Sequence, residues 1–418
     1  DMGRTWDWEA VYSEVVFDLD TFRSPTAALP TGFNAGAGSI QALNGTGWSN
    51  ADVKGIWRPQ GANGAHQVSF GAHADRYKLV STTSTTANWG AGDPLATTQL
   101  AVGRTSTNAL WLQDAWRVTE GTRLTLGLRG EHWRAYDGQN FSAAPASNVY
   151  QPNLSATRFS PKASIAWQPA QNWRATASYG TAYRFPTVTE LYQAVTVSGV
   201  VYTPNPNLAP ERAYSGELAL ERVLERGRVR LSLFQESLHD ALIAQNSTIP
   251  GTNVIGSSVQ NIDSVRSRGF ELAAEVNDVY KKGLDLSGSM TFVDSKILSD
   301  PNFRNAAGVL TNVSGNYTPN IPRFKATALA TYRYDEHWTG TLAARYSTRV
   351  WATVDNTDIH PNTYQGFYHY FVVDARVRYQ IRKNWSAAVG VDNLNNDKYF
   401  LFHPFPQRTA VAELKFDM

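Results

Sequence analysis

The amino-acid sequence predicts an all-β fold, arranged as an antiparallel up-and-down meander of about sixteen strands. Three observations support this prediction. Apolar residues recur at every second position in many segments. Short turns alternate with long loops between those segments. Three of the short turns are followed at once by tryptophan. The 31 glycines and 19 prolines suit a chain with many turns and disfavour long helices.

Four segments show the strand pattern most clearly. In residues 173–184, Trp, Ala and Tyr side chains alternate with Arg, Thr and Ser side chains, and the same alternation occurs in residues 324–334, 338–347 and 371–379. A further segment, residues 409–418, shows the same alternation, and its final residue lies on the apolar face. Each segment is therefore expected to form a strand with one apolar and one polar face.

The connections between the strands differ in length at the two ends of the predicted sheet. Short turns are expected near residues 61–65, 119–122, 168–172, 225–227, 277–282, 335–337 and 382–384, and long loops near 20–46, 82–99, 137–155, 186–210, 247–258, 298–320 and 351–366. Short turns at one end and long loops at the other are typical of outer-membrane barrels. The sequence thus predicts a transmembrane antiparallel β-barrel in the bacterial outer membrane, with its apolar faces against outer-membrane lipid.

The tryptophans that follow the short turns support this placement. Trp173, Trp338 and Trp385 each begin a strand directly after a turn. Indole rings gather at membrane interfaces, so three rings at one height are expected to form an aromatic belt.

Composition and motifs exclude several other functions. The net charge of +2 offers no polybasic field for nucleic acid, and the absence of cysteine removes thiolate catalysis and Cys-based metal sites. No phosphate-binding loop, nucleophile elbow or His-Glu-x-x-His sequence is present, and the eight histidines never fall at metal-ligand spacing. We therefore expect no enzyme, no catalytic or metal residue and no cofactor bound by the barrel.

Several motifs carry a resemblance to a known family. Residues 160–192 contain Ser178-Tyr179-Gly180, Arg184, Pro186 and Glu190-Leu191-Tyr192, and residues 205–211 read Asn-Pro-Asn-Leu-Ala-Pro-Glu. Residues 266–271, 391–399 and 408–416 complete the set, and residues 391–399 resemble a motif that the family carries in the penultimate strand of its barrel. In this order they resemble the barrel of TonB-dependent outer-membrane receptors.

The resemblance implies a barrel of about 22 strands filled by an N-terminal plug. Residues 1–418 are then expected to be a single C-terminal barrel region with about sixteen of those strands and no plug domain. If the last strand descends to the periplasm, counting backward makes the strand expected near residues 5–18 the seventh of the family. Six strands, the plug and the segment that contacts TonB are expected to precede Asp1, so the first strand and the last strand (408–417) should be separate edges.

The function implied by the resemblance is active transport. A monomeric receptor is expected to bind a scarce small-molecule metal chelate, above all a ferric siderophore, and to import it with energy from the TonB complex. Haem, cobalamin or a sugar remain alternative ligands. A passive sixteen-stranded porin is the main alternative, and a soluble or surface all-β binding protein or surface enzyme is a third. Aromatic-bearing loops around the rim favour the receptor.

Candidate ligand contacts follow from the expected geometry. The loop and rim residues able to stack on or coordinate a ligand are Tyr192, Tyr202, Trp351, His360, Tyr364, His369 and His403. The basic residues expected to line the lumen are Arg174, Arg184, Lys325, Arg345, Arg376 and Arg378. These cations either attract an anionic chelate or pair with carboxylates in the lumen.

Overall fold

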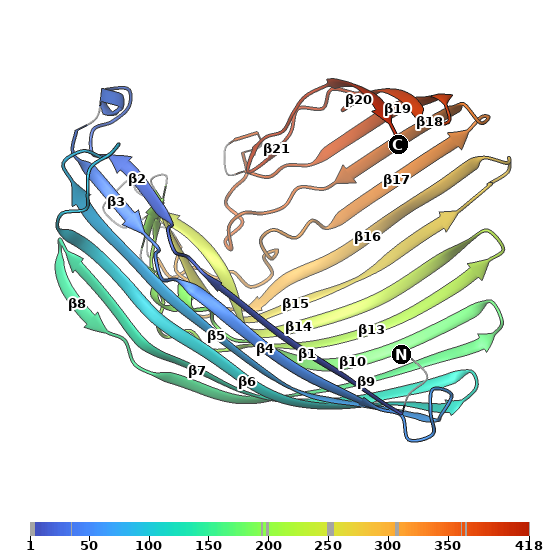
Figure 1. The fold of residues 1–418 in the computed structure, drawn as a ribbon, viewed down its shortest axis with the longest axis horizontal. Coiled ribbons are helices and arrows are strands. Elements are labelled where there is room, and N and C mark those ends of the chain that lie inside the picture. The colour runs from blue at the N-terminus through green and yellow to red at the C-terminus, as the bar shows by residue number, and fades with distance from the viewer. Residues whose placement is uncertain are drawn as a thin grey trace.

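The computed structural model describes residues 5–34, 36–193, 195–197, 200–248, 255–305, 309–360, 362–363 and 366–417, and most of them lie in one curved sheet (Figure 1). Sixteen strands follow one another across this sheet, each hydrogen-bonded antiparallel to the next. They are β1 (Trp6–Val16), β4 (Gly47–Trp57), β5 (His66–Thr86), β6 (Thr97–Thr119), β7 (Thr122–Ala143), β9 (Leu154–Ala170), β10 (Trp173–Arg184), β13 (Glu211–Leu224), β14 (Gly227–Thr248), β15 (Ile255–Val276), β16 (Leu284–Ser299), β17 (Phe324–Arg333), β18 (Trp338–Ser347), β19 (Tyr370–Arg382), β20 (Trp385–Asp392) and β23 (Thr409–Phe416). The predicted meander is confirmed.

The remaining elements lie in the long connections. They are β2 (Thr21–Pro25), the 3-10 helix η1 (Thr31–Asn34), β3 (Gly38–Ala42), β8 (Ala146–Tyr150), the helix α1 (Val188–Tyr192), β11 (Val195–Val197), β12 (Val200–Tyr202), β21 (Phe400–Leu401) and β22 (His403–Pro404). β12 pairs in parallel with β15. No helix among the described residues is long and apolar enough to cross a bilayer.

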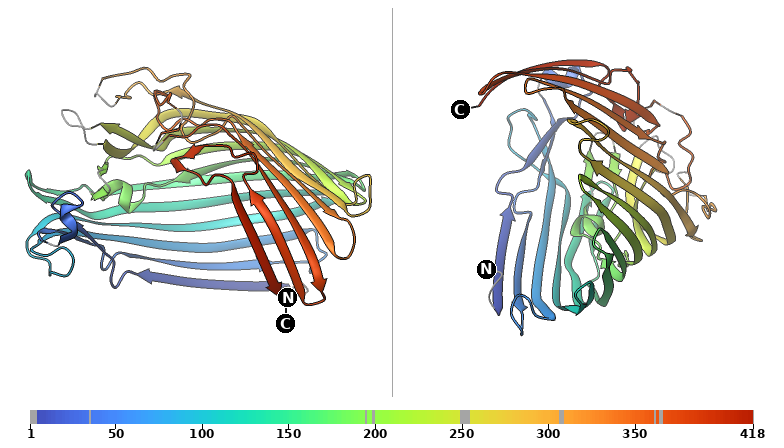
Figure 2. Two further views of the ribbon diagram at one scale, coloured as in Figure 1. Left: turned by 90° about the horizontal axis from the view of Figure 1, so that it is seen from above. Right: turned by 90° about the vertical axis from the view of Figure 1, so that its right-hand side faces the viewer.

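The two edges of the sheet are separate. Among the described residues, β1 is paired only with β4, and β23 only with β20. Figure 1 shows β1 and β20, the neighbour of β23, on opposite sides of the opening, and Figure 2 shows the same trough from two further directions. The arrangement agrees with the expected partial barrel, whereas a closed porin requires hydrogen bonds between β1 and β23.

The short turns and long loops gather at opposite ends, as expected, but several predicted loops are partly strand. β5 continues to Thr86 and β6 begins at Thr97, inside the loop expected over 82–99. β7 continues to Ala143 and pairs with β8, inside the loop expected over 137–155. Thr, Ser and Asn residues are compatible with strands when a neighbouring strand satisfies their backbone groups. The strand matched to residues 391–399 is also shorter than expected and ends at Asp392.

The predicted tryptophan belt has a regular geometry. Directly opposed residues connect Trp173 on β10, across six strand boundaries, to Ala344 on β18. Trp338 lies six residues before Ala344, toward the short turn that precedes β18. Directly opposed residues also connect Trp338, across two further strand boundaries, to Ala387 on β20. Trp385 lies two residues before Ala387, toward the short turn that precedes β20. In both comparisons the tryptophan is shifted along its strand by one residue for each strand boundary crossed. Tilted barrel strands have a stagger of this kind, so the three rings share one height.

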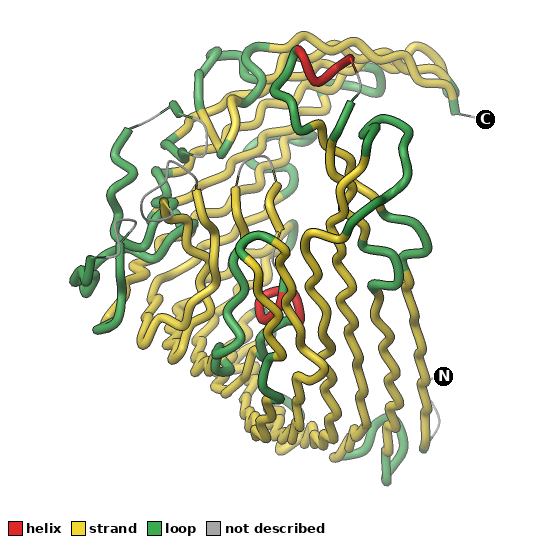
Figure 3. The backbone as a smooth tube through the Cα atoms, turned by 90° about the vertical axis from the view of Figure 1, so that its left-hand side faces the viewer, coloured by secondary structure: helices red, strands yellow, loops and turns green. Residues whose placement is uncertain are grey.

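The inner face of the sheet is identified by α1. Figure 3 shows this helix within the curve of the sheet. Leu191 and Tyr192 of α1 are buried in one cluster with Leu79 and Trp133 of the wall. Side chains at alternate positions point away from this cluster, and Leu110 among them is 71% exposed. An apolar surface exposed on the outer face is the expected membrane-facing side.

Candidate ligand-binding site at the loop end

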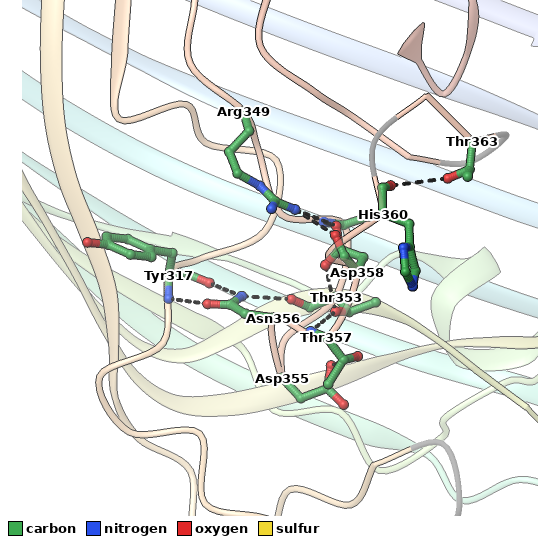
Figure 4. A network of polar contacts seen from close by, with 10 residues as sticks. Tyr317, Arg349, Thr353, Asp355, Asn356, Thr357, Asp358, His360 and Thr363 are labelled. Carbon is green, nitrogen blue, oxygen red and sulfur yellow. Dashed lines mark hydrogen bonds and ion pairs between the residues drawn. The ribbon is translucent and has the colours of Figure 1, made fainter.

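The loop between β18 and β19 is folded around the carboxylate of Asp358 (Figure 4). The backbone N–H of Ala352 and the hydroxyl of Thr353 each donate to this carboxylate at 2.9 Å. Arg349 donates to the Asp358 carbonyl oxygen at 2.6 Å, and its guanidinium lies 3.7 Å from the carboxylate. The acid thus closes the loop on itself.

Asn356 joins this loop to the neighbouring loop between β16 and β17. Its Oδ1 accepts the N–H of Tyr317 at 2.8 Å, and its Nδ2 donates to the carbonyl oxygen of Tyr317 at 3.0 Å. Asn356 adopts a left-handed backbone conformation with φ of +53°, which Asn tolerates better than most residues. Below these contacts, Phe303, Val313 and Val354 are buried in a shared apolar cluster. The two loops therefore form one packed unit.

A cation and aromatic rings meet on this unit. The guanidinium of Arg349 lies 3.7 Å from the ring centroid of Trp351 and 6.0 Å from that of Tyr368. The Nε atom of Arg349 is buried and has no hydrogen-bond partner among the described residues. Tyr368 is in turn 4.4 Å from the ring of His369. Two of the predicted contacts, Trp351 and His369, are thereby connected through residues that the sequence analysis did not select.

The loop between β20 and β23 adds a second group of rings. Phe402 lies 4.7 Å from His403 and 6.3 Å from Phe367, as measured between ring centroids. Phe402 has a φ of +68°, an uncommon backbone conformation for a bulky residue, and is 39% exposed. The Tyr368 N–H donates to the Phe400 carbonyl oxygen at 3.3 Å, which places the two groups side by side. We call the residues Arg349, Trp351, Phe367, Tyr368, His369, Phe402 and His403 the rim cluster.

The other predicted ligand contacts lie elsewhere. His360 is exposed in the loop after β18, outside the rim cluster as defined. Tyr202 ends β12, and its side chain lies outside what the structure describes, as does all of Tyr364.

Tyr192 is placed differently from the expectation. It is 1% exposed, and its ring packs against glycines on two strands, so that a Cβ atom at Gly103 or Gly138 would lie 2.2 or 2.5 Å from it. Burial raises the pKa of Tyr192 to about 12, with a smaller contribution from the charge of Asp137. α1 begins with a capping box, in which Thr187 and Glu190 satisfy each other's backbone N–H groups. The Glu-Leu-Tyr motif therefore anchors α1 against the wall, and the Tyr192 ring has no free face for a ligand.

The six predicted basic residues lie on the inner face. Pairing connects Arg174 to Glu221 and continues through β14 to β17 to reach Arg345, and directly opposed residues share a face. Four of the six form ion pairs, namely Arg174 with Glu221, Arg184 with Glu190, Arg345 with Asp374 and Arg376 with Glu413. Arg378 donates to Gln380, and Lys325 has no ion pair among the described residues. Pairing with lumen carboxylates is thus the main arrangement.

The inner wall between these ion pairs is hollowed by small residues. A depression of about 640 Å³ is lined by Ser287, Gly288 and Ser289 and bordered by Arg230 and Arg345. Among the residues that the structure describes, no group of three or more His, Asp or Glu side chains is arranged to hold a metal ion.

The sequence analysis missed four residues of the rim cluster, namely Arg349, Phe367, Tyr368 and Phe402. The pattern Arg349-Val350-Trp351 was a usable signal for the first, because it places a cation two residues from a selected aromatic residue. No local signal distinguishes Phe402 from the neighbouring phenylalanines, since its exposure depends on how the loop folds.

A staggered antiparallel wall with an apolar outer face, an aromatic belt at the turn end and packed loops at the other end defines a bacterial outer-membrane β-barrel protein. A family model described as "TonB dependent receptor-like, beta-barrel" matches residues 2–394. The chain belongs to this family of TonB-dependent receptors, and its location is the outer membrane.

Individual relatives agree with this assignment. A probable TonB-dependent siderophore receptor, PiuA of Acinetobacter baumannii, is 24% identical over 417 residues, which cover 96% of this chain and 52% of the relative. The iron-regulated outer membrane virulence protein of Vibrio cholerae is 25% identical over 247 residues, covering 56% of this chain and 32% of the relative. The chain thus spans about half the length of the first relative.

Solved structures show the same fold. The siderophore receptor PiuA of Acinetobacter baumannii superposes with a TM-score of 0.69 at 17% identity, covering 98% of this chain and 62% of that structure. The unliganded ferric citrate transporter FecA gives a TM-score of 0.71 at 16% identity, with 98% and 58% covered.

Proposed function

We propose that this chain forms most of the barrel wall and part of the external binding site of a receptor that imports a ferric siderophore with energy from TonB. The observation that carries the proposal is the rim cluster, in which the Arg349 cation and several aromatic rings gather on packed loops. The names of relatives that bind siderophores or ferric citrate support it.

The chemistry of the rim cluster suits an anionic chelate. An exposed ring supplies a stacking face of low conformational entropy, and a partly buried guanidinium attracts negative charge more strongly than one in water. The guanidinium of Arg349 also lies 3.7 Å from the ring centroid of Trp351, which keeps the cation and a stacking ring together. Loops that are already packed lose little entropy when a ligand binds.

The open sheet and the matched barrel family support the C-terminal placement of residues 1–418. In this proposal the rest of the receptor supplies the other barrel strands, the plug and the segment that contacts TonB. A passive porin is the alternative, and it is favoured by none of the contacts of the described residues.

The test uses the natural protein purified from its own outer membranes. Binding of ferric citrate and of a ferric catecholate complex is measured for the wild type, Arg349→Ala and Trp351→Ala. Each substitution is expected to weaken binding of the preferred chelate about tenfold or more. Glu336→Gln, in a turn at the other end, is the control.

Uptake of radioactive iron then separates the two functions. Uptake that stops when the proton gradient is collapsed supports the receptor. Uptake that continues, together with chelate binding unchanged in both rim variants, contradicts it and favours the porin.

A further inference from the structure

The outer face of the wall has an aromatic row near the loop end. Phe270 on β15 lies opposite Phe292 on β16, with ring centroids 5.9 Å apart. Phe292 lies opposite Phe324 on β17, whose ring is 6.0 Å from Tyr346 on β18. A row of aromatic rings on the lipid-facing side marks the interface between hydrocarbon and water.

Basic residues follow directly beyond this row. Arg268 and Arg266 lie two and four residues from Phe270 toward the loops, and Lys296 lies four residues beyond Phe292. Because alternate residues of a strand share a face, these cations lie on the same outer face as the rings. Arg323 directly precedes Phe324, and its guanidinium lies 5.0 Å from the ring centroid of Tyr317. We call Arg266, Arg268, Lys296 and Arg323 the basic patch.

The basic patch contains more positive charge than the described carboxylates neutralise. Arg266 and Lys296 are directly opposite each other in the antiparallel pair, an arrangement that is destabilising for like charges. Among the described residues, Asp294 is the carboxylate that forms ion pairs with this patch. It lies 3.6 Å from Arg268 and 3.8 Å from Lys296, and both distances exceed those of ordinary hydrogen bonds. Among the described residues, Arg266 and Arg323 form no ion pair.

A second pair of opposed cations shows how the chain neutralises such a contact when it supplies the anion itself. Lys78 on β5 lies opposite Arg104 on β6, also on the outer face. There Asp137 accepts a hydrogen bond from Arg104 at 2.7 Å. No carboxylate is that close to Arg266 or Lys296 among the described residues.

We propose that the basic patch binds the phosphate group of a lipid in the outer leaflet of the membrane. Phosphate oxygens form strong charge-assisted hydrogen bonds with guanidinium and ammonium groups. The patch lies directly above the aromatic row, so a lipid that places its phosphate there keeps its acyl chains against the apolar band. This geometry favours a lipid headgroup over a free anion.

The test measures lipid binding to the natural protein purified in a neutral detergent. The probe is fluorescent phosphatidic acid, and the matched lipid without phosphate is fluorescent diacylglycerol. The double variant Arg266→Gln/Lys296→Gln is expected to bind phosphatidic acid about 25-fold more weakly, from about fivefold for each cation removed, with diacylglycerol binding unchanged. Arg228→Gln/Arg230→Gln removes the same charge from the inner face and is expected to bind like the wild type.

Three results would overturn the proposal. The first is unchanged affinity for phosphatidic acid in the Arg266→Gln/Lys296→Gln variant. The second concerns the variant Arg266→Lys/Lys296→Arg, which keeps both charges and is expected to bind phosphatidic acid nearly normally. A loss of affinity in this variant as large as that in Arg266→Gln/Lys296→Gln would contradict the proposal. The third is displacement of the lipid by inorganic phosphate at equal concentration, which would identify a free-anion site. Iron uptake is not used as a readout, so failure here leaves the proposed import function standing.

Discussion

The side-chain amide of Asn395 hydrogen-bonds to the backbone of Val373, its Oδ1 accepting the Val373 N–H at 3.0 Å. The same amide donates from Nδ2 to the carbonyl oxygen of Phe371 at 2.6 Å. Asp397 accepts the N–H of Phe371 at 2.8 Å. β20 ends at Asp392, so these side chains take over as partners of β19 where the neighbouring strand stops. The family motif at residues 391–399 thus acts as a substitute for a strand.

Asn395→Ala is expected to destabilise the barrel. The substitution leaves the Val373 N–H and the Phe371 carbonyl without their protein partners, at a cost of about 1–3 kcal/mol in the free energy of unfolding. Urea unfolding of the natural protein in micelles measures this cost. Asn153→Ala is the control, because Asn153 is exposed and has no side-chain hydrogen bond among the described residues. Equal stability of the two variants would contradict the role of Asn395.

Tyr192→Phe is expected to change the pH dependence of stability. The pKa of Tyr192 is raised from 10.0 to about 12 in the folded protein. The buried neutral phenol therefore contributes stability that is complete below pH 10 and is lost as the pH rises through 12. Thermal unfolding at pH 8–12 should show a smaller loss in Tyr192→Phe than in the wild type, and ligand binding at pH 8 should be equal. A parallel loss in both proteins would argue against the raised pKa.

Asp358→Ala is expected to loosen the loop that carries Arg349 and Trp351. The substitution removes the acceptor of the Ala352 N–H and of the Thr353 hydroxyl. Protease cleavage within residues 348–360 should accelerate, and chelate affinity should fall about tenfold because the loop must be ordered on binding. The exposed Glu120→Ala in a turn at the opposite end is the control. Faster cleavage with normal affinity would separate loop order from binding.

Ala328→Arg is expected to impair membrane insertion. Ala328 lies on the outer face, where an arginine near the bilayer midplane costs about 2–4 kcal/mol. Thr327→Arg places the same side chain on the inner face and should insert normally. The amount of folded protein in outer-membrane fractions compares the two. Similar insertion of both variants would contradict the assignment of faces.

The chain expressed alone is expected not to insert stably. Among the described residues, the outer edges of β1 and β23 have no strand partner, and unpaired backbone groups in lipid cost several kcal/mol each. Fractionation of cells that express residues 1–418 should find aggregated chain, with no leakage of small solutes. Stable insertion with size-limited leakage would instead support a porin.

The strands and their orientation could be predicted from the sequence because they depend on local chemistry. Neighbouring residues determine the alternation of apolar and polar side chains around Trp338 and the short turn before it. A strand with one buried face needs apolar side chains at every second position, whatever the rest of the fold is. The inner position of Arg174 and Arg345 followed from the same alternation. Local chemistry also identified the motif at residues 190–192, although it could not tell an anchor from a ligand contact.

Tertiary structure alone decided the parts that depend on distant residues. Tyr192 is buried because Gly103 and Gly138, on two other strands, leave room for its ring. Arg349 joins the rim cluster because Asp358 folds the loop back upon it. Arg266 and Lys296 are 30 positions apart in the sequence and become opposed only through the register of β15 and β16. Contacts of this kind follow from packing and pairing across the sheet, which the pattern of one strand does not contain.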